Sequence, residues 1–294
     1  MRWQRWAARG LVFLLAMAPG PDVMAGDWIT KGGSPLRSST VVDSHGLIEL
    51  AAYWETQPLG ESAAQPAVVD GVIYHLAGDY LWRLDLREVS PPNAVATEIR
   101  DQVSNLPIRF NVTPDGQFIA PQSSPSYSPE TGILYFGTGY GWLWAYHTKE
   151  GWAQPAELDL GCPIVGSPLV IHDRGQDIVV VSDRPNYPGE ENQPQGRPLC
   201  PRSHGKVWVV QGLDQRDGSV HQQVYEATSS KQDEGGFGGF ITPSAVLAPS
   251  HGVNPSLVIG TDGFDGGRAV RLALDRESNY SPYLVWTVDG PSGF

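Results

Sequence analysis

The chain has 294 residues, a net charge of −12 and only 18% charged residues, and no long basic run occurs in it. A surface of this sign repels phosphate backbones, so the composition excludes a protein that binds nucleic acid by neutralising phosphates. The 34 glycines and 25 prolines, with 10 tryptophans and 11 tyrosines, are typical of one large all-β domain with short strands and many turns.

The first 25 residues predict a secretory signal peptide. Three arginines precede a short apolar core at 11–18, and Val23-Met24-Ala25 resembles a small-residue cleavage site. Eight apolar residues are too few to span a bilayer, which needs about twenty. We expect cleavage near Ala25 and export to the periplasm or the outside, with no membrane span in the remaining chain.

After residues 26–46, which we expect to be irregular, LIELAAYWET at 47–56 predicts a strand. The chain then repeats one arrangement four times: a small residue and a proline, a strand, a turn glycine, and two or three further strands. The copies start at Gln65-Pro66, Ser124-Pro125, Ser167-Pro168 and Thr242-Pro243, and their turn glycines are Gly71, Gly132, Gly175 and Gly252. Outer strands are expected at 94–103, 156–160, 220–228 and 283–288. One such meander cannot bury its own faces, so the copies should pack against one another.

The second copy, SSPSYSPETGILYFGTGYGWLWAY at 123–146, resembles the repeat of PQQ-like (quinoprotein-type) β-propellers, and the other copies match it more loosely. The resemblance covers about residues 28–290. It implies four-stranded antiparallel blades at about 64–103, 123–160, 166–228 and 241–289, with the first strand innermost. Because 47–56 precedes the first copy while the fourth copy has its own outer strand, it also implies an incomplete, N-terminal part of a propeller of seven or eight blades. The open flanks of such a part favour self-association.

On this architecture the long loops gather on one face, where binding sites usually lie. The two cysteines of the chain, Cys162 and Cys200, fall on that face of the third copy and predict a disulfide in an oxidising compartment. The alternative is two free thiols too far apart to bond. The loop residues expected to contact a partner are Arg184, Glu190, Glu191, Asp233, Glu234, Phe237 and Phe264.

PQQ-dependent dehydrogenases of the family commonly carry a vicinal Cys-Cys disulfide, a calcium shell and a catalytic aspartate. This sequence has no Cys-Cys pair and no matching acidic cluster, so we predict no catalytic residue and no cofactor, with PQQ and Ca²⁺ as the alternative. Asp262 and Asp265 in a glycine-rich turn can supply oxygen ligands to calcium, or they are ordinary turn residues.

Three tryptophans of the third strands, Trp82, Trp144 and Trp208, align in one register with Leu272. This repetition indicates packing between blades more than a cofactor cage. We therefore expect an exported, non-catalytic binding or scaffold module for another exported protein, a glycan or a surface polymer. The alternatives are a quinoprotein oxidoreductase or other propeller enzyme whose site is completed by missing blades, and a fragment without a function of its own.

Overall fold

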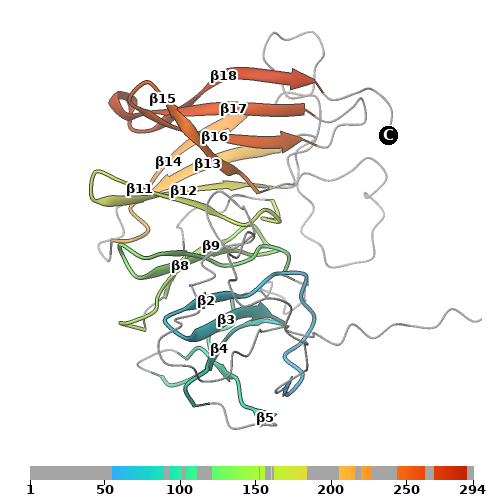
Figure 1. Cartoon of the computed structure of the whole chain (residues 1–294). Coiled ribbons are helices and arrows are strands. Elements are labelled where there is room, and N and C mark those ends of the chain that lie inside the picture. Colours follow the sequence, from blue (N-terminus) through green and yellow to red (C-terminus); the bar gives the residue numbers. More distant parts are fainter. Residues whose placement is uncertain are drawn as a thin grey trace, which may run out of the picture.

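The described residues form four antiparallel sheets of four strands each, called blades 1 to 4, and one two-stranded sheet. The blades follow one another in a row (Figure 1). The computed structural model describes residues 55–88, 93–100, 104–110, 121–151, 153–155, 160, 162–183, 205–215, 220–226, 244–261 and 268–289. These residues contain no α-helix, and only a three-residue 3-10 turn, η2 (Arg276–Ser278), interrupts the strands. The predicted all-β fold of four-stranded antiparallel blades is confirmed.

In each blade the strands follow one another in the sheet in the order of the chain. Blade 1 consists of β2 (Ala67–Val69), β3 (Val72–Ala77), β4 (Tyr80–Asp85) and β6 (Thr97–Glu98). Blade 2 consists of β7 (Ser126–Ser128), β8 (Ile133–Gly137), β9 (Leu143–His147) and β10 (Ala153–Pro155). Blade 3 consists of β11 (Leu169–Asp173), β12 (Gln176–Ser182), β13 (Lys206–Gln211) and β14 (His221–Glu226). Blade 4 consists of β15 (Val246–His251), β16 (Asn254–Thr261), β17 (Arg268–Asp275) and β18 (Ser281–Asp289).

Tight turns join the first two strands of a blade. Asp70-Gly71 in blade 1 and Arg174-Gly175 in blade 3 have positive φ at both positions, 49° and 75° in the first and 51° and 80° in the second. Two consecutive residues with positive φ are the pattern of type I′ hairpin turns, which match the twist of the strands. The turn glycines predicted at these two positions are therefore confirmed.

Serine hydroxyls connect the first strands of neighbouring blades by one repeated contact. The backbone N–H of Gln65 donates to Ser124 Oγ (2.7 Å), that of Ser124 to Ser167 Oγ (3.0 Å), and that of Ser167 to Ser244 Oγ (2.6 Å). The serine equivalent to Ser124 and Ser167 in blade 4 is thus Ser244, two residues after the predicted start at Thr242. The contact needs a hydroxyl oxygen as acceptor, and the proline on which the prediction relied plays no part in it.

The outer strands agree with the prediction in blades 3 and 4 and differ in blades 1 and 2. β14 and β18 lie where strands were expected at 220–228 and 283–288. In blade 1 only β6, two residues long, pairs with β4 within the predicted range 94–103. In blade 2 the strand lies at Ala153–Pro155, before the predicted range 156–160, because the turn at Gly151 (φ 69°) returns the chain to β9 at once.

A short segment covers the face of blade 1 that points away from blade 2. β1 (Glu55–Thr56) pairs in parallel with β5 (Asn93–Ala94), and it is the only described part of the strand predicted at 47–56. Immediately after β1, Gln57 Nε2 donates to Ala96 O (2.7 Å), and Leu59 packs onto the apolar side chains of this face. Blade 1 is therefore covered on both faces by residues of its own chain.

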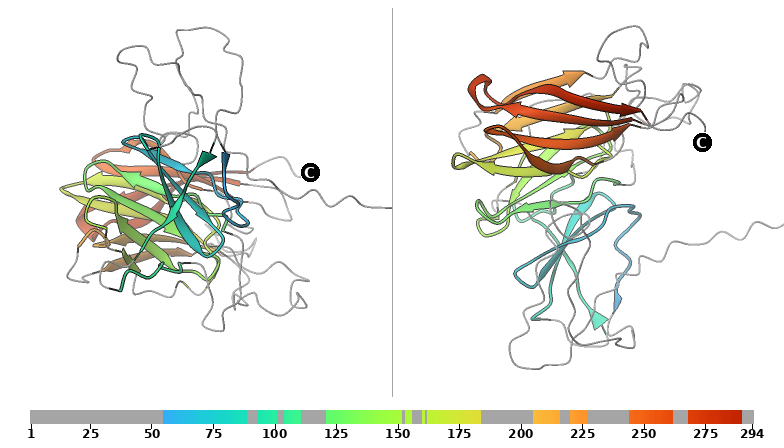
Figure 2. Two further views of the ribbon diagram at one scale, coloured as in Figure 1. Left: turned by 90° about the horizontal axis from the view of Figure 1, so that it is seen from below. Right: turned by 45° about the horizontal axis from the view of Figure 1, so that its top comes forward.

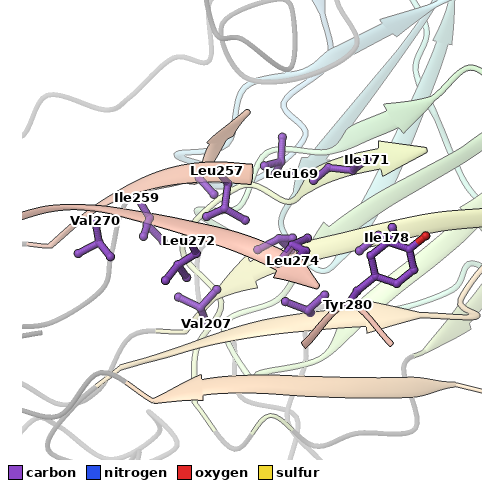
Figure 3. Packing of buried hydrophobic residues seen from close by; sticks show 13 residues of the cluster. Leu169, Ile171, Ile178, Val207, Leu257, Ile259, Val270, Leu272, Leu274 and Tyr280 are labelled. Carbon is purple, nitrogen blue, oxygen red and sulfur yellow. The ribbon is translucent and has the colours of Figure 1, made fainter. Parts of the chain in front are cut away.

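The hydrophobic core lies between the blades. Separate apolar clusters join blades 1 and 2, blades 2 and 3, and blades 3 and 4. Figure 3 shows the last of these, in which side chains of β16 and β17 meet those of β11 to β13. In blade 4 a row of leucines, Leu247, Leu257, Leu272 and Leu284, crosses all four strands toward blade 3. Each leucine removed from water contributes about 2 kcal/mol, so sheet-on-sheet burial holds the array together.

Two tryptophans of the third strands, Trp144 and Trp208, pack between blades as predicted, whereas Trp82 packs on the face of blade 1 that points away from blade 2. Trp144 faces blade 1, where its ring meets Phe110 edge to face with centroids 4.9 Å apart. Trp208 faces blade 2. Trp82 pairs with His75 and Trp144 with Phe136, each four residues after the turn glycine of its blade. Trp208 pairs with Val181, six residues after Gly175, so its register is shifted by two residues. A shift of two residues keeps the same face, so the predicted single register is wrong for Trp208 although its orientation is right.

Candidate functional site

The loop residues predicted to bind a partner or a metal lie outside the described residues, and these predictions stay untested. They are Arg184, Glu190, Glu191, Asp233, Glu234, Asp262, Phe264, Asp265 and Phe237. Cys162 is completely buried and is not a free thiol. Its proposed partner Cys200 lies outside the described residues, so the pairing remains a prediction.

Asp177 in β12 is a carboxylate with 1% of its surface exposed, and it connects blades 2 and 3. Its Oδ1 accepts a hydrogen bond from Ser128 Oγ (2.9 Å) and lies 2.9 Å from His172 Nδ1. Its Oδ2 accepts from Thr131 Oγ1 (2.5 Å) and from the hydroxyl of Tyr135 (2.8 Å). Four partners replace the water that burial removes, as a buried charge requires.

This cluster has residue types that also occur in catalytic sites, but its carboxylate and its tyrosine hydroxyl are enclosed. Burial, reinforced by the negative charge of Asp177, raises the pKa of Tyr135, so its hydroxyl remains a donor. Burial also raises the pKa of Asp214, and the charge of Asp177 adds to this effect. Tyr135, Ser128 and the carboxylate of Asp177 are buried, whereas His172 and Thr131 are at least partly exposed. We therefore interpret the cluster as a polar contact between blades.

A second polar contact joins blades 3 and 4. Arg276 in η2 donates from Nε and Nη2 to the two carboxylate oxygens of Asp173, both at 2.7 Å, and the hydroxyl of Tyr280 donates to Asp173 Oδ2 at 2.7 Å. Burial alone would raise the pKa of Asp173, but the hydrogen bonds from Arg276 and Tyr280 outweigh it and hold this pKa below its usual value. Among the described residues no group of three or more His, Cys, Asp or Glu side chains is placed to hold a metal ion.

A cavity of about 20 Å³ lies in the face of blade 1 that the segment after β1 covers. It is lined by Thr56, Leu59, Ile73, His75, Trp82, Leu84 and Ala96. This volume holds about one water molecule, and the buried Nδ1 of His75 has no hydrogen-bond partner. Burial lowers the pKa of His75 from 6.5 to about 4. The cavity therefore stabilises a neutral imidazole and is too small for an organic ligand.

The neutral state of His75 predicts a loss of stability in mild acid. Protonation of His75 is disfavoured in the folded chain relative to the unfolded chain. The neutral imidazole therefore contributes to the free energy of unfolding above pH 6.5, and this contribution is lost as the pH falls toward about 4. At pH 5 we expect the loss to reach about 2 kcal/mol. Urea unfolding at pH 7 and pH 5 measures it, with His75→Gln as the control in which this part of the pH dependence disappears. Equal pH dependence of the two proteins would contradict the prediction.

The face of blade 4 that points away from blade 3, called the outer face, is also apolar. One row of cross-strand partners, Val246, Val258, Arg271 and Trp286, runs across β15, β16, β17 and β18. Partners in register share one face of a sheet, and this row alternates with the leucine row that packs on blade 3. On one side of this row the outer face continues with Ala248, Ser256, Ala273 and Tyr283 and then with the polar pair Asp275 and Ser281, and on the other side with Gly260, Ala269 and Val288.

Part of the outer face is exposed. Trp286 is 37% and Val288 57% exposed, whereas Leu257 and Leu272 on the opposite face are completely buried. An antiparallel sheet with one face in water normally alternates apolar and polar residues, and continuous apolar runs mark strands covered on both faces. β18, with the sequence SPYLVWTVD, has such a run, whereas the corresponding strand of blade 3, β14, reads HQQVYE. Blade 4 ends the row of blades in Figures 1 and 2.

In the part of the chain that the structure describes, the outer face carries two charged side chains, Arg271 and Asp275. The carboxylate of Asp275 caps η2, where it accepts from the N–H of Glu277 and the hydroxyl of Ser278. Arg271 Nη2 donates to Pro249 O (2.6 Å) and lies 3.2 Å from Ser256 Oγ, and Arg271 Nε donates to the same hydroxyl at 3.3 Å. These neutral oxygens fix the guanidinium on the sheet without neutralising it. The arrangement holds a cation in place between Val258 and Trp286. Arginine and tryptophan are both enriched at protein–protein interfaces.

Comparison with known proteins adds little to this description. No family model matches the chain, and no curated protein sequence matches it. A solved quinohemoprotein alcohol dehydrogenase from Pseudomonas putida is similar over 90% of this chain and 40% of its own, with a TM-score of 0.49 and 14% sequence identity. The chain thus spans less than half the length of that protein. Among the described residues there is no helix of the length and apolar character that crossing a membrane requires.

Proposed function

We propose that the chain is an exported, non-catalytic scaffold that binds another protein through the outer face of blade 4. The observation that carries this proposal is that both faces of blade 4 are apolar, while only one of them is covered by the described chain. Export follows from the signal peptide predicted at residues 1–25. The predicted role of the long-loop face, and a glycan or surface polymer as its ligand, remain expectations of the sequence.

The covered faces of the other blades support this proposal. In blade 3 both faces carry buried valines and isoleucines, one set packed on blade 2 and the other on blade 4. The outer face of blade 4 also carries apolar side chains, among them Val246, Val258 and Trp286, and it occupies the position at which the next sheet of such a row would pack. A partner that presents an apolar sheet face would repeat a contact that this chain already makes three times.

A labelled β-hairpin peptide tests the proposal. The peptide carries valines on one face, threonines on the other and an Asn-Gly turn, and its binding to the full chain is followed by fluorescence anisotropy. We expect Trp286→Lys to weaken binding tenfold or more, since loss of an aromatic anchor typically costs about 2 kcal/mol. Val95→Lys is the matched control, because Val95 is 72% exposed but lies outside the outer face. Equal effects of the two substitutions, or no binding to the unaltered chain, would contradict the proposal.

A further inference from the structure

Arg271 differs from the other arginines of the described chain in its partners. Six described arginines form ion pairs with carboxylates. They are Arg83 and Arg87 with Asp85, Arg100 with Glu98, Arg109 with Asp79, Arg174 with Glu277 and Arg276 with Asp173. Arg271 contacts only the neutral oxygens of Pro249 and Ser256. Its counter-charge is therefore not supplied by the described residues.

The bonds to these two oxygens leave one end of the guanidinium available. They use Nε and Nη2, so the N–H groups of Nη1 remain for a further acceptor. A guanidinium held in one orientation has lost part of its rotamer freedom before a partner arrives, which favours binding. Because Val258 and Trp286 flank it, a partner that covers the outer face would also remove it from water. A charge desolvated in this way must be paired, or it opposes the association.

A second copy of the chain does not satisfy this requirement. Two outer faces packed across a two-fold axis at Arg271 would bring the two Arg271 side chains together, and like charges in a desolvated contact are unfavourable. The carboxylate of Asp275 on the same face already accepts hydrogen bonds in the cap of η2. The far face of blade 1 is already covered by Leu59 and the contact of Gln57 with Ala96, so a head-to-tail contact is blocked as well.

We infer that the partner of the outer face presents an apolar protein surface with one carboxylate, which binds Arg271. This inference rests on the function proposed above and adds the chemistry of the partner. The apolar neighbours supply the buried area, and the carboxylate selects the partner, because surfaces without it leave the cation unpaired.

Two hairpin peptides test the inference. The first is the neutral valine-faced peptide with glutamine at the centre of the valine face, and the second has glutamate at that position. We expect the glutamate peptide to bind the full chain about tenfold more tightly than the glutamine peptide. Arg271→Gln should abolish this preference without weakening the glutamine peptide, and Arg271→Lys should retain part of it. Arg174→Gln, which removes a charge from an arginine 54% exposed in the turn of blade 3, should leave the preference unchanged.

The outcomes separate this inference from the proposed function. If both peptides bind equally and still require Trp286, the carboxylate is not recognised and only the inference is overturned. If neither peptide binds, both are overturned. If the chain sediments as a dimer that Trp286→Lys converts into a monomer, the outer face is covered by a second copy and the inference is again overturned.

Discussion

Replacing Asp177 with alanine is expected to lower the free energy of unfolding by about 3–5 kcal/mol, measured by urea unfolding at pH 7. The substitution removes the common acceptor of the hydroxyls of Ser128, Thr131 and Tyr135, and two of these donors, Ser128 and Tyr135, are buried. Each buried donor without a partner costs about 1–3 kcal/mol, and partial collapse of the site recovers some of this. The loss should therefore exceed that of an ordinary surface substitution several-fold.

Two variants determine whether the lost hydrogen bonds are the cause. Tyr135→Phe removes one donor, so Asp177→Ala should cost less in the Tyr135→Phe protein than in the unaltered chain. Glu88→Ala removes a carboxylate at an exposed position and should change the stability by less than about 0.5 kcal/mol. Strict additivity of Asp177→Ala and Tyr135→Phe would show that the network does not act as a unit.

The strands of this protein could be predicted from the sequence because local signals specify them. Short apolar runs that closely follow the turn glycines Gly132 and Gly175 mark β8 and β12, and Gly71 and Gly175 mark turns that need positive φ. The outer strand β6 is shorter than predicted and β10 lies before its predicted range, because two or three residues of pairing leave almost no pattern in a sequence. Contacts between blades, such as that of Ser167 N–H with Ser244 Oγ, join residues too distant in the chain for any local signal.

The sequence predicts the outer face of blade 4 only as an open flank that favours self-association, and it does not indicate which residues form the contact. Long loops carry function in many proteins, so the individual residues predicted to contact a partner all lie in loops. A signal for the outer face was nevertheless present, because YLVW in β18 is apolar at consecutive positions rather than at alternate ones. Arg271 could not be found in the same way. An arginine within a strand gives no indication of its partners, and only the structure shows that they are neutral oxygens.

Alanine at Gly137 is expected to destabilise the chain by about 3 kcal/mol, at the upper end of the usual range for overpacking. A Cβ atom on Gly137 would lie 2.2 Å from Cγ2 and 2.5 Å from Cβ of Ile164, and 3.2 Å from Ser123 Oγ. Ile164 cannot move away easily, because it is 1% exposed and its backbone N–H donates to Thr138 O at 3.0 Å. Thermal and urea unfolding of Gly137→Ala measure the effect.

The cause of this loss can be isolated by a double-mutant cycle with Ile164→Gly, which removes both contacting carbon atoms. Gly137→Ala should then cost at least about 2 kcal/mol less than it does beside isoleucine. Gly175→Ala is the matched control: nothing lies within 4 Å of its added Cβ, so only the positive φ opposes it, at about 1 kcal/mol. If Gly137→Ala is as costly beside glycine as beside isoleucine, the close approach of the chain at Ile164 is not what requires a glycine. If the coupling is found, Gly137 serves the packing of the chain segment that enters blade 3.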